Sequence, residues 1–105
     1  MKLVLLMYLE EDAELVAKIL RKYDIEAFSR LEAEGWTKSL PSPWSGERTP
    51  YRSEFVVTLV AEDRAAELMG AVAECFGCAD ERHPIHAVQL DVDRMTSSLI
   101  SETDA

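Results

Sequence analysis

The chain carries two cysteines and two histidines, all that it has of either type, within one stretch of twelve residues: Cys75, Cys78, His83 and His86. The C-x2-C spacing lets two thiolates reach one soft cation, and the C-x4-H-x2-H continuation is tighter than common zinc-finger spacing. The stretch therefore predicts a site for a divalent or soft metal ion, with these four side chains as ligands.

Two other interpretations of this stretch stay open. Cys75 and Cys78 would form a redox-responsive pair if one thiol were exposed and had a lowered pKa, which the neighbouring acids oppose. Alternatively, the stretch has no chemical role. Cys75 lies near the expected end of a helix, where a small buried hydrophobe is ordinary, and His86 begins an expected strand, where it can simply face solvent.

The composition limits the classes of partner. A chain of 105 residues provides one domain with a single modest core. Its net charge of −9 argues against a nucleic-acid partner, which needs a basic stripe, and against an anionic membrane surface. No apolar stretch is long enough to span a bilayer, and no export signal is recognisable, so we expect a cytoplasmic protein with reduced cysteines.

Four segments have the pattern of β-strands. Leu3–Leu9 is apolar at every position and Phe55–Ala61 at every position but Thr58, which is typical of strands in the interior of a sheet. Each is followed by two acids and an amphipathic helix, over about 11–23 and 62–76. Ile25–Glu34 and Ile85–Val92 then alternate between apolar and polar residues, which predicts half-buried strands.

This βαβ pattern, occurring twice, predicts the fold class. We expect an α+β, ferredoxin-like βαββαβ sandwich with two helices on one face of an antiparallel sheet. The first and third strands should be central, flanked by the second and fourth. The domain is expected over 1–93, with a long loop at 35–50 between strands two and three and a C-terminal tail at 94–105.

The second face of the predicted sheet has no element to cover it. Neither central strand has a polar side that would tolerate water. We therefore expect that another copy of the chain covers this face and that the protein is a homo-oligomer.

This layout, together with the run His83-Pro84-Ile85-His86-Ala87-Val88, resembles the PII signal-transduction superfamily and its PII-like relatives over Met1 to about Asp93. The resemblance implies a trimer that binds adenine nucleotides, and sometimes small anions, in clefts between subunits. It also implies a regulator of a partner such as a membrane transporter. The cleft walls would be Gly35–Pro50, Gly77–His83 and Asp91–Met95.

The ligand-binding residues that the resemblance implies are glycines and cations of these three walls. Guanidinium groups suit phosphate or carboxylate in bidentate fashion, although each cation taken alone could instead serve in a surface salt bridge. The candidates are Gly35, Lys38, Arg48, Arg52, Gly77, Arg82 and Arg94.

The Gly77–His83 stretch departs from the PII pattern. It has one glycine and two acids, where PII proteins have a glycine-rich loop with a lysine. Carboxylates repel a triphosphate, which argues against ATP bound in the family's usual mode. The chain is thus similar to divergent PII-like proteins, some of which regulate transport of metals or inorganic carbon. The trimeric copper-tolerance proteins share the architecture and are a second possible family.

An enzyme is the class that the sequence supports least. It contains no nucleophile elbow, no phosphate-cradling glycine loop and no evident acid–base pair. We therefore predict that the protein is not an enzyme. The remaining alternative is a small enzyme on a dimeric α/β barrel, with Tyr8 or His86 facing a closed pocket and an even number of subunits.

Overall fold

A computed structural model describes residues 1–36, 51–74 and 85–96, and the fold is built from these parts of the chain. In chain order its elements are β1 (Lys2–Leu9), a 3-10 turn (Glu10–Asp12), α1 (Ala13–Lys22), β2 (Ser29–Gly35), β3 (Tyr51–Val60), α2 (Glu62–Glu74) and β4 (His86–Asp91). Neither described helix is long and apolar enough to cross a membrane.

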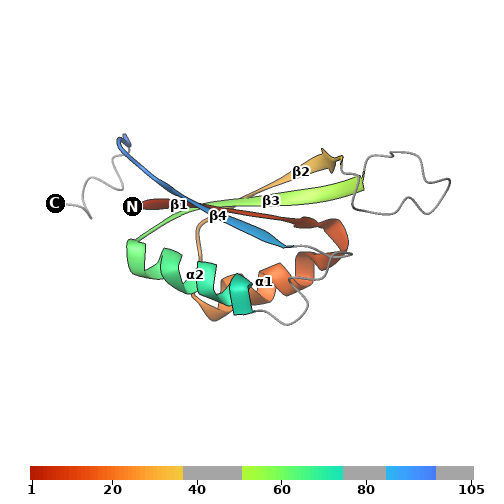
Figure 1. Cartoon of the computed structure of the whole chain (residues 1–105), viewed down its shortest axis with the longest axis horizontal. Coiled ribbons are helices and arrows are strands. Elements are labelled where there is room, and N and C mark those ends of the chain that lie inside the picture. Colours follow the sequence, from red (N-terminus) through yellow and green to blue (C-terminus); the bar gives the residue numbers. More distant parts are fainter. Residues whose placement is uncertain (37–50, 75–84, 97–105) are drawn as a thin grey trace.

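The described strands form one four-stranded sheet in the order β2-β3-β1-β4, and every neighbouring pair is antiparallel. Both helices lie against the same face of this sheet (Figure 1). The predicted ferredoxin-like sandwich is therefore confirmed, as are the central positions of the first and third strands.

The hydrophobic core lies between the sheet and the two helices. Because strand side chains alternate between faces, Val4, Leu6 and Tyr8 of β1 all point toward the helices and are buried. Both helices meet them with a 3.6-residue apolar stripe. Its buried members are Val16, Ile19 and Leu20 of α1 and Ala65, Leu68 and Val72 of α2.

Three polar contacts join segments that lie far apart in the chain. The Tyr8 hydroxyl donates a hydrogen bond of 2.9 Å to the Glu54 carboxylate, and both residues are buried. The Thr58 hydroxyl donates at 2.8 Å to the Ala27 carbonyl, which precedes β2. Arg64, near the start of α2, donates at 2.6 Å to the carbonyl of Tyr23 at the end of α1.

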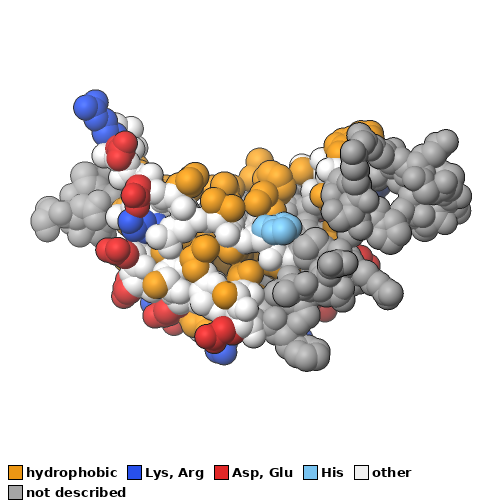
Figure 2. Space-filling view, viewed as in Figure 1, with side chains coloured by type: hydrophobic (Ala, Val, Ile, Leu, Met, Phe, Trp, Pro, Cys, Tyr) orange, Lys and Arg blue, Asp and Glu red, His pale blue; other side chains and the backbone are white. Residues whose placement is uncertain are grey.

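The opposite sheet face is apolar, and no described element covers it. Figure 2 shows hydrophobic side chains gathered along this face, above the layer of helices. Leu31 and Leu90, on the two edge strands, are 51% and 47% exposed. The cross-strand pairs at its centre are Leu3 with Leu59, Leu5 with Val57 and Met7 with Phe55.

Several predicted boundaries differ from the structure. β2 begins at Ser29 rather than Ile25, because Ile25 packs into the core directly after Asp24, whose φ of 54° turns the chain at the end of α1. β3 begins at Tyr51 rather than Phe55, because pairing with β2 extends it through three polar residues. β2 is also mostly exposed rather than half-buried, as expected of a sheet edge.

Candidate ligand site at the loop end of the sheet

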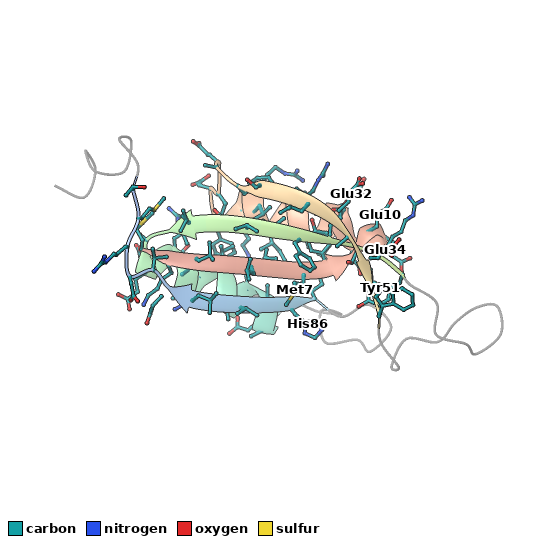
Figure 3. The ribbon with its side chains drawn as sticks, turned by 90° about the horizontal axis from the view of Figure 1, so that it is seen from above. Met7, Glu10, Glu32, Glu34, Tyr51 and His86 are labelled. Carbon is teal, nitrogen blue, oxygen red and sulfur yellow. The ribbon has the colours of Figure 1, made fainter. Side chains whose placement is uncertain are left out.

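Three strand ends meet at one end of the sheet, which we call the loop end. β2 ends there at Gly35, β3 begins opposite it at Tyr51, and β4 begins at His86 opposite Met7. Figure 3 shows Met7, His86, Tyr51 and Glu34 together in this region. The chain leaves β2 for residues 37–50 here, and it enters β4 here after residues 75–84.

A cavity of about 170 Å³ lies at the loop end. Its volume is close to the roughly 150 Å³ of an engineered protein cavity that holds benzene, so it accommodates a group about the size of one ring. Aromatic and aliphatic side chains make up most of the lining. The lining residues are Met7, Tyr8, Leu9, Glu34, Gly35, Tyr51, Ser53, Phe55 and His86.

The Tyr51 ring is positioned by the absence of a side chain at Gly35. The two residues are register partners, and a Cβ placed on Gly35 would overlap the Tyr51 ring. The ring therefore lies against the bare backbone of the edge strand, an arrangement used to cover edge glycines in sheets. Any side chain at position 35 would force the Tyr51 ring to move from its place at the cavity wall.

The described surroundings of the cavity are acidic. A neighbouring hollow of about 380 Å³ is lined by Glu10, Glu32, Ala33, Glu34, Arg52 and Ser53, so Glu34 borders both spaces. Arg52 is the cation of this hollow, and its guanidinium lies 3.9 Å from a Glu10 carboxylate oxygen. Its side chain is 86% exposed, so this pair is screened by water and contributes little to stability.

Tyr8 borders the cavity, but its hydroxyl belongs to the core. Burial, followed by the hydrogen bond to Glu54, raises the pKa of Tyr8 well above its ordinary value. The phenol is therefore protonated at neutral pH and donates to Glu54. A role for Tyr8 as a proton acceptor in an enzyme has no support in this geometry.

The structure brings together part of the predicted ligand set. Gly35 and His86 line the cavity, and Arg52 lies in the hollow beside it. Arg94 lies elsewhere, because β4 runs away from the loop end and Asp91 pairs with Lys2 at the far end of β1. A single chain therefore does not place Arg94 beside Gly35.

The remaining predicted residues lie outside the described parts of the chain: Lys38, Arg48, Cys75, Gly77, Cys78, Arg82 and His83. Of the four predicted metal ligands, only His86 is described. Within residues 1–36, 51–74 and 85–96, no three His, Cys, Asp or Glu side chains come together as a metal site. The metal prediction stays a prediction.

The sequence analysis missed most of the cavity lining, including Met7, Glu34, Tyr51 and Phe55. Met7 and Phe55 lie within apolar runs that read as core, and Glu34 reads as part of a solvated strand face. Tyr51 directly follows the loop, which was a usable signal. Only the strand register shows that all four meet at one end of the sheet.

No protein-family model matches the chain, and neither does any curated protein. Solved structures do. CutA from Pyrococcus horikoshii is 19% identical with a TM-score of 0.67, covering 96% of this chain and 93% of CutA. A Thermus thermophilus structure, described as a PII-like signalling protein, is 15% identical with a TM-score of 0.63, covering 87% of this chain and 85% of the other.

A nitrogen regulatory PII-like protein from Thiomonas intermedia, solved with ADP, AMP and bicarbonate, is 12% identical. Its TM-score is 0.59, and the alignment covers 90% of this chain and 94% of that protein. Identities this low show the fold alone. The resemblance predicted from the sequence is confirmed at that level: the chain has the ferredoxin-like fold that CutA and the PII-like proteins share.

Proposed function

We propose that the protein is a PII-like regulatory protein that senses a small ligand at the loop end of the sheet, in clefts between copies of the chain. One observation carries the proposal. The cavity lies where residues 37–50 leave β2 and return to β3, and its Met7 and Phe55 walls continue directly into the open apolar face. Ligand binding and assembly would then share one surface.

Assembly through the open face follows from its chemistry. Burying a leucine-sized side chain contributes about 1.5–3 kcal/mol, and the three central cross-strand pairs are all apolar. Large exposed apolar patches mark interaction sites. A second copy of the chain is the occupant we propose, and a trimer is the number that the PII resemblance implies.

The position of Arg94 supports clefts between subunits. Within one chain it follows β4 at the end of the sheet far from Gly35. If Arg94 contributes to a cavity, that Arg94 must therefore belong to a neighbouring copy of the chain. Residues 37–50 start at the cavity wall, so an occupied cavity could be sensed by a protein partner there, such as a membrane transporter.

Assembly is tested by native mass spectrometry of the wild type, Leu5→Glu and Ala66→Glu. Leu5 is at the centre of the open face, whereas Ala66 is exposed on α2, so both variants add one negative charge. We expect multimeric wild type and Ala66→Glu, and a folded, largely monomeric Leu5→Glu. A wild type that is monomeric at tens of micromolar would contradict assembly through this face.

Ligand sensing is tested by titrating ADP, AMP and bicarbonate while following the amide NMR signals of Met7, Tyr51 and His86. The proposal expects saturable shifts at these residues for at least one ligand. Circular dichroism at each endpoint controls for unfolding. If none of the ligands, and no other small molecule tested, perturbs the loop end, the sensing function is wrong.

A metal-binding protein of the copper-tolerance type is the second candidate. The observation in its favour is that His86 and Met7 are register partners and both line the cavity, and imidazole and thioether groups suit soft ions. Cys75, Cys78 and His83 would complete the set. Replacing both cysteines by serine should abolish metal uptake measured by mass spectrometry, and an unchanged stoichiometry would exclude this candidate. That the protein is not an enzyme stays a prediction.

A further inference from the structure

We propose that copies of the chain join edge to edge, with β2 of one copy paired to β4 of the next in one defined register. That register places His86 of the partner subunit opposite Gly35, so each cavity at the loop end lies beside a residue from a second copy. This inference rests on the proposed function, because it assigns the strands through which the copies meet.

The two strands concerned are the outer strands of the described sheet (Figure 3). The outer edge of such a strand presents a row of backbone N–H and C=O groups that can pair with another chain. β2 runs in the direction of β1, and β4 runs in the opposite direction. Copies arranged around an axis along the strands therefore bring β2 beside an antiparallel β4, with all loop ends at the same end of the assembly.

The sheet itself limits the possible registers. One row of paired residues crosses it from edge to edge: Leu31, Phe55, Met7 and His86. Hydrogen-bonded and non-hydrogen-bonded pairs alternate along such a row, so its two outer residues direct their backbone polar groups either both outward or both inward. Leu90 lies four residues after His86 and shares its orientation. Leu31 and Leu90 therefore match in backbone orientation and in the face from which their side chains project.

Pairing Leu31 with the partner's Leu90 also matches the side chains. Both leucines are about half exposed in a single chain and would cover each other. Arg30 then lies opposite the partner's Asp91. The Asp91 side chain is 77% exposed although it pairs with Lys2 of its own chain, so a second cation has access to it. In this register all six residues of β4 have a partner in β2.

Other pairings of the edges fit less well. A shift of two residues in one direction puts Glu32 opposite the partner's Asp91, which sets like charges across from each other. The same shift in the other direction puts Arg30 opposite the partner's Gln89 and loses the ion pair. A shift of one residue would place the apolar faces of the two copies on opposite sides. Pairing β2 with a second β2 would leave both β4 edges and the enlarged apolar face in water.

The β2–β4 contact connects assembly to the candidate site. Because it joins two different edges, it can close into a ring, and the open apolar faces of the copies then turn toward one another. The partner's His86 lies opposite Gly35, whose backbone carries the Tyr51 ring of the cavity wall. The wall around Gly35 and Tyr51 is thus completed by an imidazole from the next copy.

The register is tested by NMR on a mixture of isotope-labelled and unlabelled copies, which reports contacts between subunits. Within one chain, Leu31 and Leu90 lie on strands separated by three strand spacings, about 14 Å, which is too far for a methyl–methyl NOE. We expect an intersubunit NOE between the Leu31 and Leu90 methyl groups. An NOE from Leu31 to Leu31 or to Val88 of another copy, or a multimer without the Leu31–Leu90 NOE, would overturn the inference.

A charge exchange tests the ion pair. Arg30→Asp and Asp91→Arg each place like charges at every contact, whereas the double variant restores opposite charges. At low salt, each single variant should raise the concentration at which half of the multimer dissociates by about fivefold, and the double variant should return it near the wild-type value. Arg21→Asp, at an exposed position on α1, makes the same charge change as Arg30→Asp and should have little effect.

These results separate the inference from the proposed function. If the double variant is weakened by the sum of the two single effects, the edge pairing is wrong. Assembly through the open face then stands if the wild type is multimeric and Leu5→Glu is monomeric. A wild type that is monomeric at tens of micromolar overturns both.

Discussion

Replacing Tyr8 by phenylalanine removes one hydroxyl and leaves the Glu54 carboxylate buried without that donor. The two residues are 4% and 6% exposed, and their hydrogen bond is 2.9 Å long. Hydrogen bonds to charged groups contribute about 1.5–3 kcal/mol, so we expect Tyr8→Phe to lower the free energy of unfolding by about 2 kcal/mol. That is a large part of the roughly 5–15 kcal/mol typical of a domain.

A double-mutant cycle attributes this cost to the pair. Tyr8→Phe, Glu54→Gln and the double variant are unfolded in urea at one fixed subunit concentration, and circular dichroism follows the transition. Glu54→Gln keeps an acceptor for the phenol and removes a buried charge, so it should cost less than Tyr8→Phe. A coupling energy below about 0.5 kcal/mol would refute the assigned contact, because coupled neighbours exceed that value.

The same pair predicts a loss of stability at alkaline pH. Since the pKa of Tyr8 is raised in the folded state, its contribution is complete below the unfolded pKa of about 10 and is lost as the pH rises above it. Above pH 10 the unfolded chain releases this proton while the folded chain retains it. The stability advantage of wild type over Tyr8→Phe should therefore shrink by up to about 1.4 kcal/mol per pH unit. An advantage that is constant from pH 9 to pH 11 would contradict the assignment.

Three further predictions concern other contacts, each checked by urea unfolding. Gly35→Ala should destabilise by about 1–3 kcal/mol, because its methyl group would overlap the Tyr51 ring, and adding Tyr51→Ala should recover part of the loss. Arg64→Met should lower the free energy of unfolding by about 1–2 kcal/mol through the lost hydrogen bond to the Tyr23 carbonyl. If the loss instead comes from the charge, Arg64→Lys should have the stability of the wild type. Thr58→Val keeps the shape of the side chain and should lower the free energy of unfolding by about 1 kcal/mol. An unchanged stability would mean that the hydrogen bond from the Thr58 hydroxyl to the Ala27 carbonyl contributes nothing.

The strand order could be predicted because it depends on local patterns. Leu3–Leu9 is apolar at every position, which suits only a strand with both faces shielded, and the next interior run repeats the pattern. Each of these runs is followed by two acidic residues and an amphipathic helix. Strands separated by helices of this length can be connected in only a few ways. Boundaries were less predictable, because Tyr51 to Glu54 become strand through pairing with β2 rather than through their own propensity.

The candidate site was predicted only in part, for a related reason. Gly35 was identified by the resemblance and His86 by its place in the cysteine and histidine stretch, and both line the cavity. Glu34 carries no signal in the sequence that separates it from its exposed neighbours on β2. Glu54 would be expected to face solvent, yet it is buried against Tyr8, 46 residues away in the chain.

The sequence by itself determined the fold of this protein and the existence of an uncovered apolar face, because hydrophobic period and segment length are properties of neighbouring residues. Only the tertiary structure decided which side chains meet at the loop end. Strand register makes that decision: a slip of one residue would turn Met7 and Phe55 toward the helices and Tyr8 and Glu54 away from them. The register depends on contacts across the whole chain, which no local stretch contains.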